Sequence, residues 1–327
     1  MNKLLSILLL LILFSSCKKE FSNTFTPDTT LSINDTSWIN QSGNKKLADS
    51  IAQALNSFSF YVDSFYANQG KEIHFNTPDD LEMSIPASSC RNPSNNPIVN
   101  GMITVRVMVV KTKGDYIRAL LETSSNAAPL QSLRCFYVEF IQNNNYLRMA
   151  PGTFYELKWG EKLAIPTMQL YVGQPTPDSS LNWLPATFNT GKLEIAYHPN
   201  NTSYPVEYEL YSSATHWVGA YQPIDSSNGT TRLNVVLPPN FTNKNTIVYA
   251  VFNNKNTVLK LKPDYASRVY FANGIPLNTA TTIISISKID NTFYWGSAST
   301  TATNANQIIV NPSQKSIADI NTLLNGL

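Results

Sequence analysis

At 327 residues the chain is long enough for two domains of typical size, each with its own hydrophobic core. Charged residues make up only 14% of it, and 24 Lys and Arg against 22 Asp and Glu leave a net charge of +2. This balance provides no concentrated basic surface, which excludes nucleic acid as a partner. The 16 Tyr and 15 Phe, with many Thr, Ile and Val, favour strands. We therefore expect a mainly β protein, with two antiparallel β-sandwich-like domains and short flanking helices.

Residues 1–16 have the pattern of a signal peptide: Lys3 supplies positive charge, Leu4 to Phe14 an apolar run, and Ser15 and Ser16 the small residues that cleavage needs. At about 1.5 Å per residue the apolar run covers only about 20 Å, too short to cross a hydrocarbon core of about 30 Å. With Cys17 behind it, the segment resembles the lipobox of bacterial lipoproteins, although a residue smaller than Phe14 is commoner three places before the cysteine. The resemblance implies that Cys17 is acylated and becomes the first mature residue.

Residues 17–43 are rich in Ser, Thr and Asn and have neither helical nor alternating periodicity. This composition predicts a flexible tether between the lipid and the folded part. The predicted partner is thus a membrane, reached through the N-terminal lipid, and the predicted location is the cell envelope at the outer membrane. The sequence does not indicate whether the protein lies on the periplasmic face or the outer face of that membrane.

The first folded domain is expected over residues 44–174. A short helix is predicted from Asn44, because Leu47, Ile51 and Leu55 fall on one helical stripe. Residues 102–111 alternate in period two, which is typical of a strand. Two further strands are predicted around the turn Asn143–Asn145, since Asn tolerates left-handed backbone.

A linker is expected over residues 175–190, where Pro175, Pro177 and Pro185 interrupt the strand rhythm. The second β-domain is then expected over 191–327, with hairpin turns at 253–256 and 290–291. A C-terminal helix with Ser313 or Ser316 as its N-cap is predicted to cover a sheet end or edge.

The order of three segments carries a resemblance to a known domain type: "LEMSIPASS", "NGMITVRVMVVKTKGDYIRALLETSS" and "LQSLRCFYVEFIQNNNYLRMAPG". Together they resemble the ZU-five type of β-sandwich found in envelope lipoproteins of Gram-negative bacteria, and the second half resembles the β-domain that often follows it there. The resemblance covers roughly residues 70–327. It implies architecture and envelope location, and it brings no catalytic residues to this chain.

If Cys17 carries lipid, the remaining cysteines are Cys90 and Cys135, an even number in a compartment that permits disulfides. Two readings stay open, a Cys90–Cys135 bridge or two buried free thiols. There is no CxxC spacing for a zinc or redox site.

The sequence contains no motif for a nucleophile elbow, a phosphate-binding loop, a dinucleotide fingerprint or a zinc protease, so no catalytic residue, metal or cofactor is predicted. Among the histidines His74, His198 and His216, only His216 beside Trp217 is considered for a functional role. The cluster Asp79, Asp80 and Glu82 lacks the ligand spacing of a calcium loop and is interpreted as a solvated turn.

Trp183 and Trp217 are the candidate ligand-stacking residues, since either ring could carry a sugar or a peptide, although tryptophans in sandwiches more often fill cores. Two function classes follow. The favoured hypothesis is a non-catalytic envelope lipoprotein for binding, adhesion or assembly, with other envelope proteins or glycans as partners. The alternative is an envelope enzyme that acts on glycan or peptide through carboxylates brought together by folding.

Overall fold

The computed structural model describes residues 38–40, 44–55, 58–77, 80–176, 180–304 and 306–327. Strands make up 51% of the protein and helices 9%, so the predicted mainly β class is confirmed. The predicted signal peptide, Cys17 and nearly all of the predicted tether lie outside the described residues. From Ser37 onward the chain forms one compact unit.

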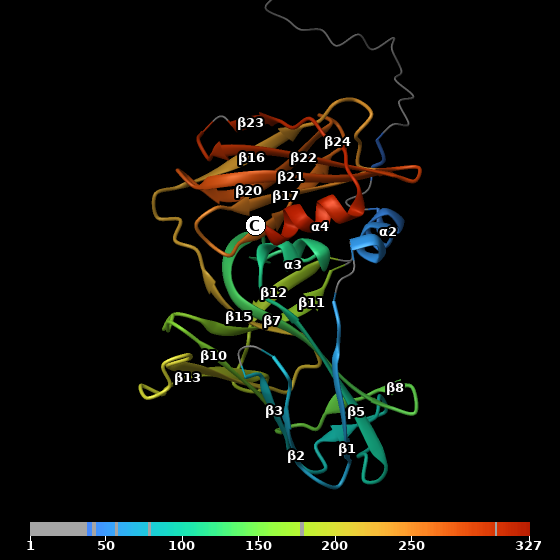
Figure 1. Cartoon of the computed structure of the whole chain (residues 1–327), viewed down its shortest axis with the longest axis vertical. Helices are drawn as coiled ribbons and strands as arrows, with labels where there is room; N and C mark the ends of the chain where they lie inside the picture. Colours follow the sequence, from blue (N-terminus) through green and yellow to red (C-terminus); the bar gives the residue numbers. More distant parts are fainter. Residues whose placement is uncertain (1–37, 41–43, 56–57, 78–79, 177–179, 305) are drawn as a thin grey trace, which may run out of the picture. The chain divides into compact units, whose positions relative to one another are not determined.

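Two sheets form the first sandwich (Figure 1). Sheet I has the order β1 (Tyr61–Tyr66), β5 (Met102–Val110), β7 (Ala128–Gln142), β15 (His216–Pro223), β11 (Gln169–Pro175) and β12 (Leu181–Pro185), and β6 (Ser124–Ser125) and β8 (Asn145–Tyr146) also pair with β7. Sheet II has the order β13 (Gly191–Tyr197), β14 (Val206–Ser212), β10 (Tyr155–Glu161), β3 (Glu82–Ile85) and β2 (Lys71–His74). A short ribbon pairs β4 (Cys90–Arg91) with β9 (Arg148–Met149).

Two further sheets form the second sandwich. Sheet III has the order β18 (Val258–Lys260), β17 (Thr246–Phe252), β21 (Ala280–Ile289), β22 (Thr292–Thr301) and β24 (Ser313–Gln314). Sheet IV has the order β19 (Lys262–Asp264), β20 (Val269–Pro276), β16 (Thr230–Val236) and β23 (Asn306–Ile309). The pair β16 and β23 is parallel, a departure from the antiparallel expectation that the long return of the chain through sheet III makes possible.

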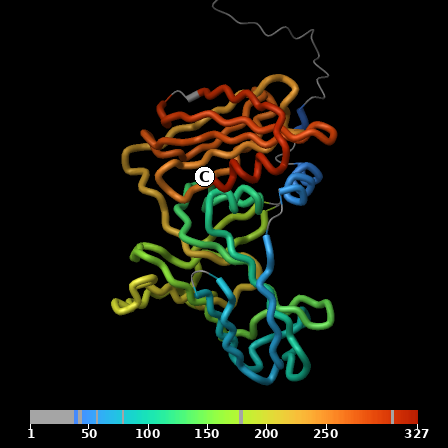
Figure 2. Tube along the Cα trace, in the orientation of Figure 1, coloured from blue at the N-terminus to red at the C-terminus, as the bar shows by residue number. Residues whose placement is uncertain are grey.

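The predicted domain boundary needs a correction. Within the expected linker, Leu181–Pro185 is strand β12, which pairs with β11 at the edge of sheet I. The strands β13, β14 and β15 that follow also belong to the first sandwich, and Figure 2 shows these yellow segments running beside the blue and green ones. The chain passes to the second sandwich only between Pro223 and Thr230. Proline misled the prediction because it is tolerated at strand ends and edges, where no ladder hydrogen bond is lost.

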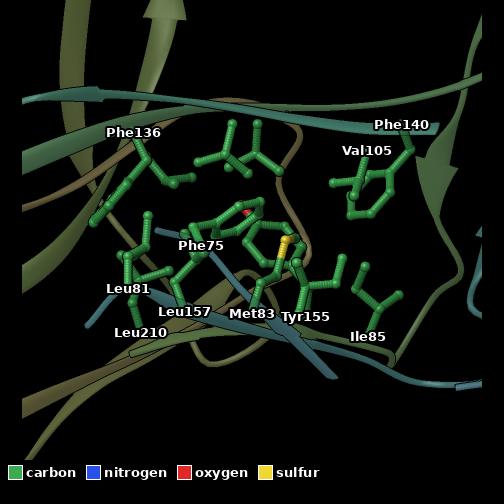
Figure 3. Close-up of a cluster of buried hydrophobic side chains, with 14 of the residues drawn as sticks. Phe75, Leu81, Met83, Ile85, Val105, Phe136, Phe140, Tyr155, Leu157 and Leu210 are labelled. Atoms are coloured by element: carbon green, nitrogen blue, oxygen red, sulfur yellow. The ribbon is translucent and has the colours of Figure 1, made fainter. Parts of the chain in front are cut away.

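Each sandwich has its own core, and the period-two alternation of the strands builds it. On β5, Ile103, Val105 and Val107 are buried between sheets I and II, where they meet Phe136 and Phe140 of β7 (Figure 3). Between sheets III and IV a second core is formed by inward residues of β16, β17, β20 and β21. Each sheet pair thus has a buried hydrophobic core that stabilises it.

A third hydrophobic cluster joins the two sandwiches. It contains residues of sheet I, residues of sheet III and one stripe from each of the helices α2 (Lys45–Leu55), α3 (Lys113–Arg118) and α4 (Ile317–Asn325). Figure 1 shows α3 and α4 between the two sandwiches. The C-terminal helix, capped by Ser316, therefore packs in this junction and does not cover a sheet edge.

Hydrogen bonds fix the junction as well. The backbone N–H of Thr123 donates to the Val258 carbonyl at 2.7 Å, and the N–H of Val258 donates to the Thr123 hydroxyl at 3.0 Å. The Thr257 hydroxyl donates to the carbonyl of Leu130 at 2.9 Å. Because these donors and acceptors are buried, water cannot replace a hydrogen bond that breaks, and its loss would be costly. The hydrogen bonds therefore hold the two sandwiches in one arrangement.

Candidate functional site

The structure separates the two candidate tryptophans. Trp183 is 0% exposed, its indole N–H donates to the Glu122 carbonyl at 2.7 Å, and its ring packs against Tyr221. Trp183 is therefore a core residue, and the expectation of a stacking role is corrected for it. Trp217 is half-buried and lines a cavity, so its ring remains accessible to a ligand.

Of the two readings left open for Cys90 and Cys135, the structure has the pair of buried free thiols. Cys90 lies in the core between sheets I and II and Cys135 in the junction cluster. Burial raises the pKa of the Cys90 thiol from 9.0 to about 11 and raises that of Cys135 further. Both thiols thus behave as small hydrophobic groups and not as nucleophiles.

His216 is exposed at the start of β15, with its backbone at a φ of +76°. Its ring lies 5.3 Å from that of Tyr137 and 6.0 Å from that of Tyr146, measured between centroids. A left-handed backbone costs a non-glycine residue about 1–3 kcal/mol, and such strain often accompanies functional sites. His216 has no carboxylate partner of the kind that activates a catalytic imidazole among the described residues.

The other two histidines lie in one polar cavity of about 290 Å³ at the edge of sheet II. His74 pairs with Glu82 at 2.9 Å and His198 with Glu207 at 3.6 Å, and Asp80 lines the same cavity. Asp79, the third member of the predicted acidic cluster, lies outside the described residues. Within the described part of the chain, no group of three or more His, Cys, Asp or Glu side chains is arranged to hold a metal ion.

Two adjoining cavities lie where sheet I meets the second sandwich. Cavity one, of about 340 Å³, is bounded by α2, the loop after α3, β12 and the segments around Ile247 and Leu261. Cavity two, of about 280 Å³, is bounded by the segment 122–127, β12, and β18 to β20. Ser180, Leu181 and Lys260 line both, so the two cavities adjoin, and together we call them the junction hollow.

Each cavity presents one half-buried aromatic ring, Trp217 in cavity one and Phe271 in cavity two. Gly173 positions Trp217, because a Cβ there would lie 2.8 Å from the Trp217 Cβ and 3.2 Å from the Trp183 ring. The Arg232 guanidinium lies 4.0 Å from the centroid of the Phe271 ring and holds it from one side.

Charge in the junction hollow centres on Glu122. Burial raises the pKa of its carboxyl, although the Lys260 N–H and the charges of Lys260 and Lys262 act in the opposite direction. The Glu122 carboxyl therefore keeps its proton to a higher pH than an exposed glutamate does. Glu122 is the only carboxylate among the described residues that line cavity two, so a pair for general acid and base is missing there.

Sequence reasoning found Trp217 but not the rest of the hollow. Its walls come from seven segments, 44–52, 119–127, Thr176 with 180–182, Trp217, 243–247, 259–263 and 270–273, and most of them are ordinary strand and loop residues. Packing of the second sandwich against sheet I brings these segments together, and no local signal indicates that packing.

Comparison with protein-family models finds no model that matches the chain, and comparison with curated proteins finds no match either. The resemblance to the ZU-five type therefore stays a prediction. In the part of the chain that the structure describes, no helix has the length and apolar character needed to cross a bilayer.

Proposed function

We propose that the protein is a lipid-anchored lipoprotein of the cell envelope, at the outer membrane, and that it is a non-catalytic binding module whose ligand occupies the junction hollow. The anchor rests on the pattern of residues 3–17, in which a short apolar run and two serines precede Cys17. The ZU-five-like segment order is part of the same proposal.

The observation that carries the binding function is the junction hollow itself. Its two cavities together have the size of ordinary ligand sites, and each combines an accessible ring with polar side chains. The hydrogen-bonded junction between the sandwiches holds these walls in place before a ligand arrives, which reduces the ordering cost of binding.

The first described residues are attached to the second sandwich. Trp38 is 7% exposed and packs in the core of sheets III and IV, 5.3 Å from the Tyr270 ring. Asn243 holds the next residue by accepting from the Ile39 N–H and donating to its carbonyl.

Mass spectrometry of the mature protein tests the anchor. The expected result is residue 17 as a lipid-modified N-terminus, and Cys17→Ala should abolish the modification and release the protein from the outer-membrane fraction. A mature protein that starts at Met1 with an intact leader would contradict the anchor.

Affinity capture from envelope extracts tests the binding function. The mature protein should retain a specific glycan or protein that Trp217→Ala fails to retain, while Phe188→Ala, which removes a ring exposed by 96%, should retain it fully. Identical recovery with the wild type and Trp217→Ala would contradict a ligand in the junction hollow.

The alternative, an envelope enzyme acting on glycan or peptide, is favoured by one observation. The polar cavity at the edge of sheet II brings Asp80, Glu82 and Glu207 together with two histidines. If this cavity is catalytic, Glu82→Gln or Glu207→Gln should lower turnover of peptidoglycan fragments by at least about 100-fold, on the scale of lost acid–base catalysis. Wild-type protein without turnover of these fragments would remove the alternative.

A further inference from the structure

The ring of Trp217 belongs to a row of aromatic side chains on the outer face of sheet I. Tyr137 is in register with Met108 on one side and with Trp217 on the other. The ring centroids of Tyr137 and Trp217 are 4.9 Å apart, and that of Phe60 lies 6.1 Å from Tyr137. These rings, which we call the aromatic row, are half-buried and lead across the strands to cavity one.

The composition of this surface differs from that of a core. Strands that pack against another sheet present mainly aliphatic and aromatic side chains with few polar neighbours, as on the inner face of sheet I. Beside the aromatic row lie the Arg106–Glu139 ion pair, with 2.7 Å between nitrogen and oxygen, and the exposed ring of His216. Flat rings thus alternate with hydrogen-bonding groups.

Cavity two continues the same pattern. Phe271 presents its ring there, and around it stand the Glu122 carboxyl, the exposed Lys262 ammonium and the amides of Asn126 and Asn273. Asn182 Nδ2 donates to Asn126 Oδ1 at 2.9 Å, and the backbone N–H of Asn126 donates to Asn182 Oδ1 at 2.7 Å. The side-chain nitrogen Nδ2 of Asn126 is left without a partner among the described residues. The Asn273 amide likewise has no side-chain partner in the described part of the chain.

The ligand chemistry that fits both cavities is that of a sugar chain. A pyranose has an apolar face of C–H groups that stacks on an aromatic ring, and an edge of hydroxyl groups that accept from amides and ammonium and donate to carboxyl oxygens. A peptide would instead pair with a strand edge. The edge strands β12, β18 and β19 border cavity two, but the ring and the amides that it presents are side-chain groups, which suit a sugar.

We propose that the junction hollow binds an oligosaccharide, with one sugar ring on Trp217 and another on Phe271. The proposal rests on the binding function proposed above and assigns its ligand class. Asn126, Asn273 and Lys262 donate to hydroxyl oxygens of the sugar over Phe271, and Glu122 accepts from one of its hydroxyls. The sugar over Trp217 lies at the end of the aromatic row, so a longer chain extends along the row toward Tyr137.

Calorimetric titration of the full mature protein in detergent tests this proposal. The probes are three tetrasaccharides: cellotetraose as a neutral hexose chain, chitotetraose as an N-acetylated chain and tetragalacturonate as an anionic chain. At least one is expected to bind with one site per protein. The wild type is also expected to bind it more tightly than the corresponding disaccharide, because only the longer probe reaches both rings.

Variants then locate the site. Trp217→Ala and Phe271→Ala should each weaken binding of that tetrasaccharide roughly tenfold or more, as for a central aromatic contact, and Asn273→Ala should weaken it severalfold. Phe271→Tyr should retain binding, and Phe188→Ala should leave it unchanged. Circular dichroism melts of each variant show whether a loss of binding comes from unfolding. Because Asn273 is exposed, Asn273→Ala tests the site without removing a buried group.

Two results would overturn the proposal: none of the three tetrasaccharides binds, or one binds equally well to the wild type, Trp217→Ala and Phe271→Ala. Either result can be distinguished from a failure of the binding function proposed above. If affinity capture still retains a protein partner that Trp217→Ala loses, the hollow is a binding site and only the sugar assignment is wrong.

Discussion

The two faces of sheet I differ in what covers them. The inner face packs against sheet II and buries residues such as Phe136, Val138 and Phe140 completely. The outer face is covered at one end by the three helices and sheet III, and at the other end it carries half-buried and exposed side chains such as Tyr137 and Tyr146. Because neighbouring residues of one strand point to opposite faces, the same strands serve folding on one side and a ligand surface on the other.

Phe136 and Tyr137 provide the sharpest test of this difference, since they are adjacent in β7. Phe136→Ala should reduce the free energy of unfolding by about 3–5 kcal/mol, because it leaves a cavity in a fully buried core. Tyr137→Ala should cost about 1–2 kcal/mol, because its ring is only half-buried. Urea denaturation of both variants measures the two losses, and equal losses would show that the outer face is packed as tightly as the inner one.

The two Arg–Glu pairs extend the comparison to charge. Arg134 and Glu161 lie on the inner side at 2.7 Å, with the Arg134 side chain 1% exposed, whereas the Arg106 side chain on the outer face is 34% exposed. Arg134→Met leaves the Glu161 carboxylate, whose side chain is 17% exposed, and Arg106→Met leaves the Glu139 carboxylate, whose side chain is 4% exposed. Both substitutions should therefore cost about 3–5 kcal/mol, because each leaves a largely buried charge without its partner. Thermal melts of the two variants measure the losses, and a loss below about 1 kcal/mol for Arg106→Met would show that water reaches Glu139 on the outer face.

The pH dependence of the free energy of unfolding tests the burial of Cys90 in the inner core. Burial raises the pKa of its thiol from 9.0 to about 11, and only a hydrogen bond with Ser89 acts in the other direction. In the unfolded chain the thiol loses its proton from about pH 9 upward, while in the folded protein it stays protonated, so the free energy of unfolding falls as the pH rises from about 9 to 11. The full loss amounts to roughly 2–3 kcal/mol.

Urea titrations at pH 8, 9 and 10 measure that fall. Cys90→Ala should show a shallower decrease than the wild type over this range, because it lacks the titrating group. Parallel pH profiles for the two proteins would mean that the Cys90 thiol is accessible to water in the folded state.

The smallest effect is expected on the uncovered end of the outer face. Tyr146 is 53% exposed on β8, so Tyr146→Ala should change the free energy of unfolding by no more than about 0.5 kcal/mol. A loss of more than about 2 kcal/mol in a urea titration would mean that another part of the protein covers this end of sheet I.

Local chemistry made several elements predictable from the sequence. The turn between β7 and β8 has Asn143 and Asn144 in the left-handed region, and the turn between β21 and β22 has Asp290 there, as the residue types suggest. Helix α2 begins after Asn44, whose side chain accepts from the Leu47 N–H, and it buries the predicted stripe. These features depend on residues only a few positions apart.

Features that depend on contacts between distant parts of the chain could not be predicted from the sequence. Strand β12 and the boundary after Pro223 depend on which strands lie next to one another in sheet I, and the composition of 175–190 indicates only that turns are present. The sequence places Trp183 in the expected linker and does not indicate that its ring is fully covered while that of Trp217 is only half-buried. The junction hollow likewise exists only because seven segments from different parts of the chain meet.

The central claim is that the outer face of sheet I and the second sandwich enclose a ligand site at the junction hollow. Hydrogen–deuterium exchange of the mature protein, with and without the tetrasaccharide that binds best, tests it most directly. The account predicts slower exchange in residues 119–127, around Trp217 and in residues 260–273, with no change in sheet II. Protection confined to sheet II, or no protection at saturating sugar, would contradict it.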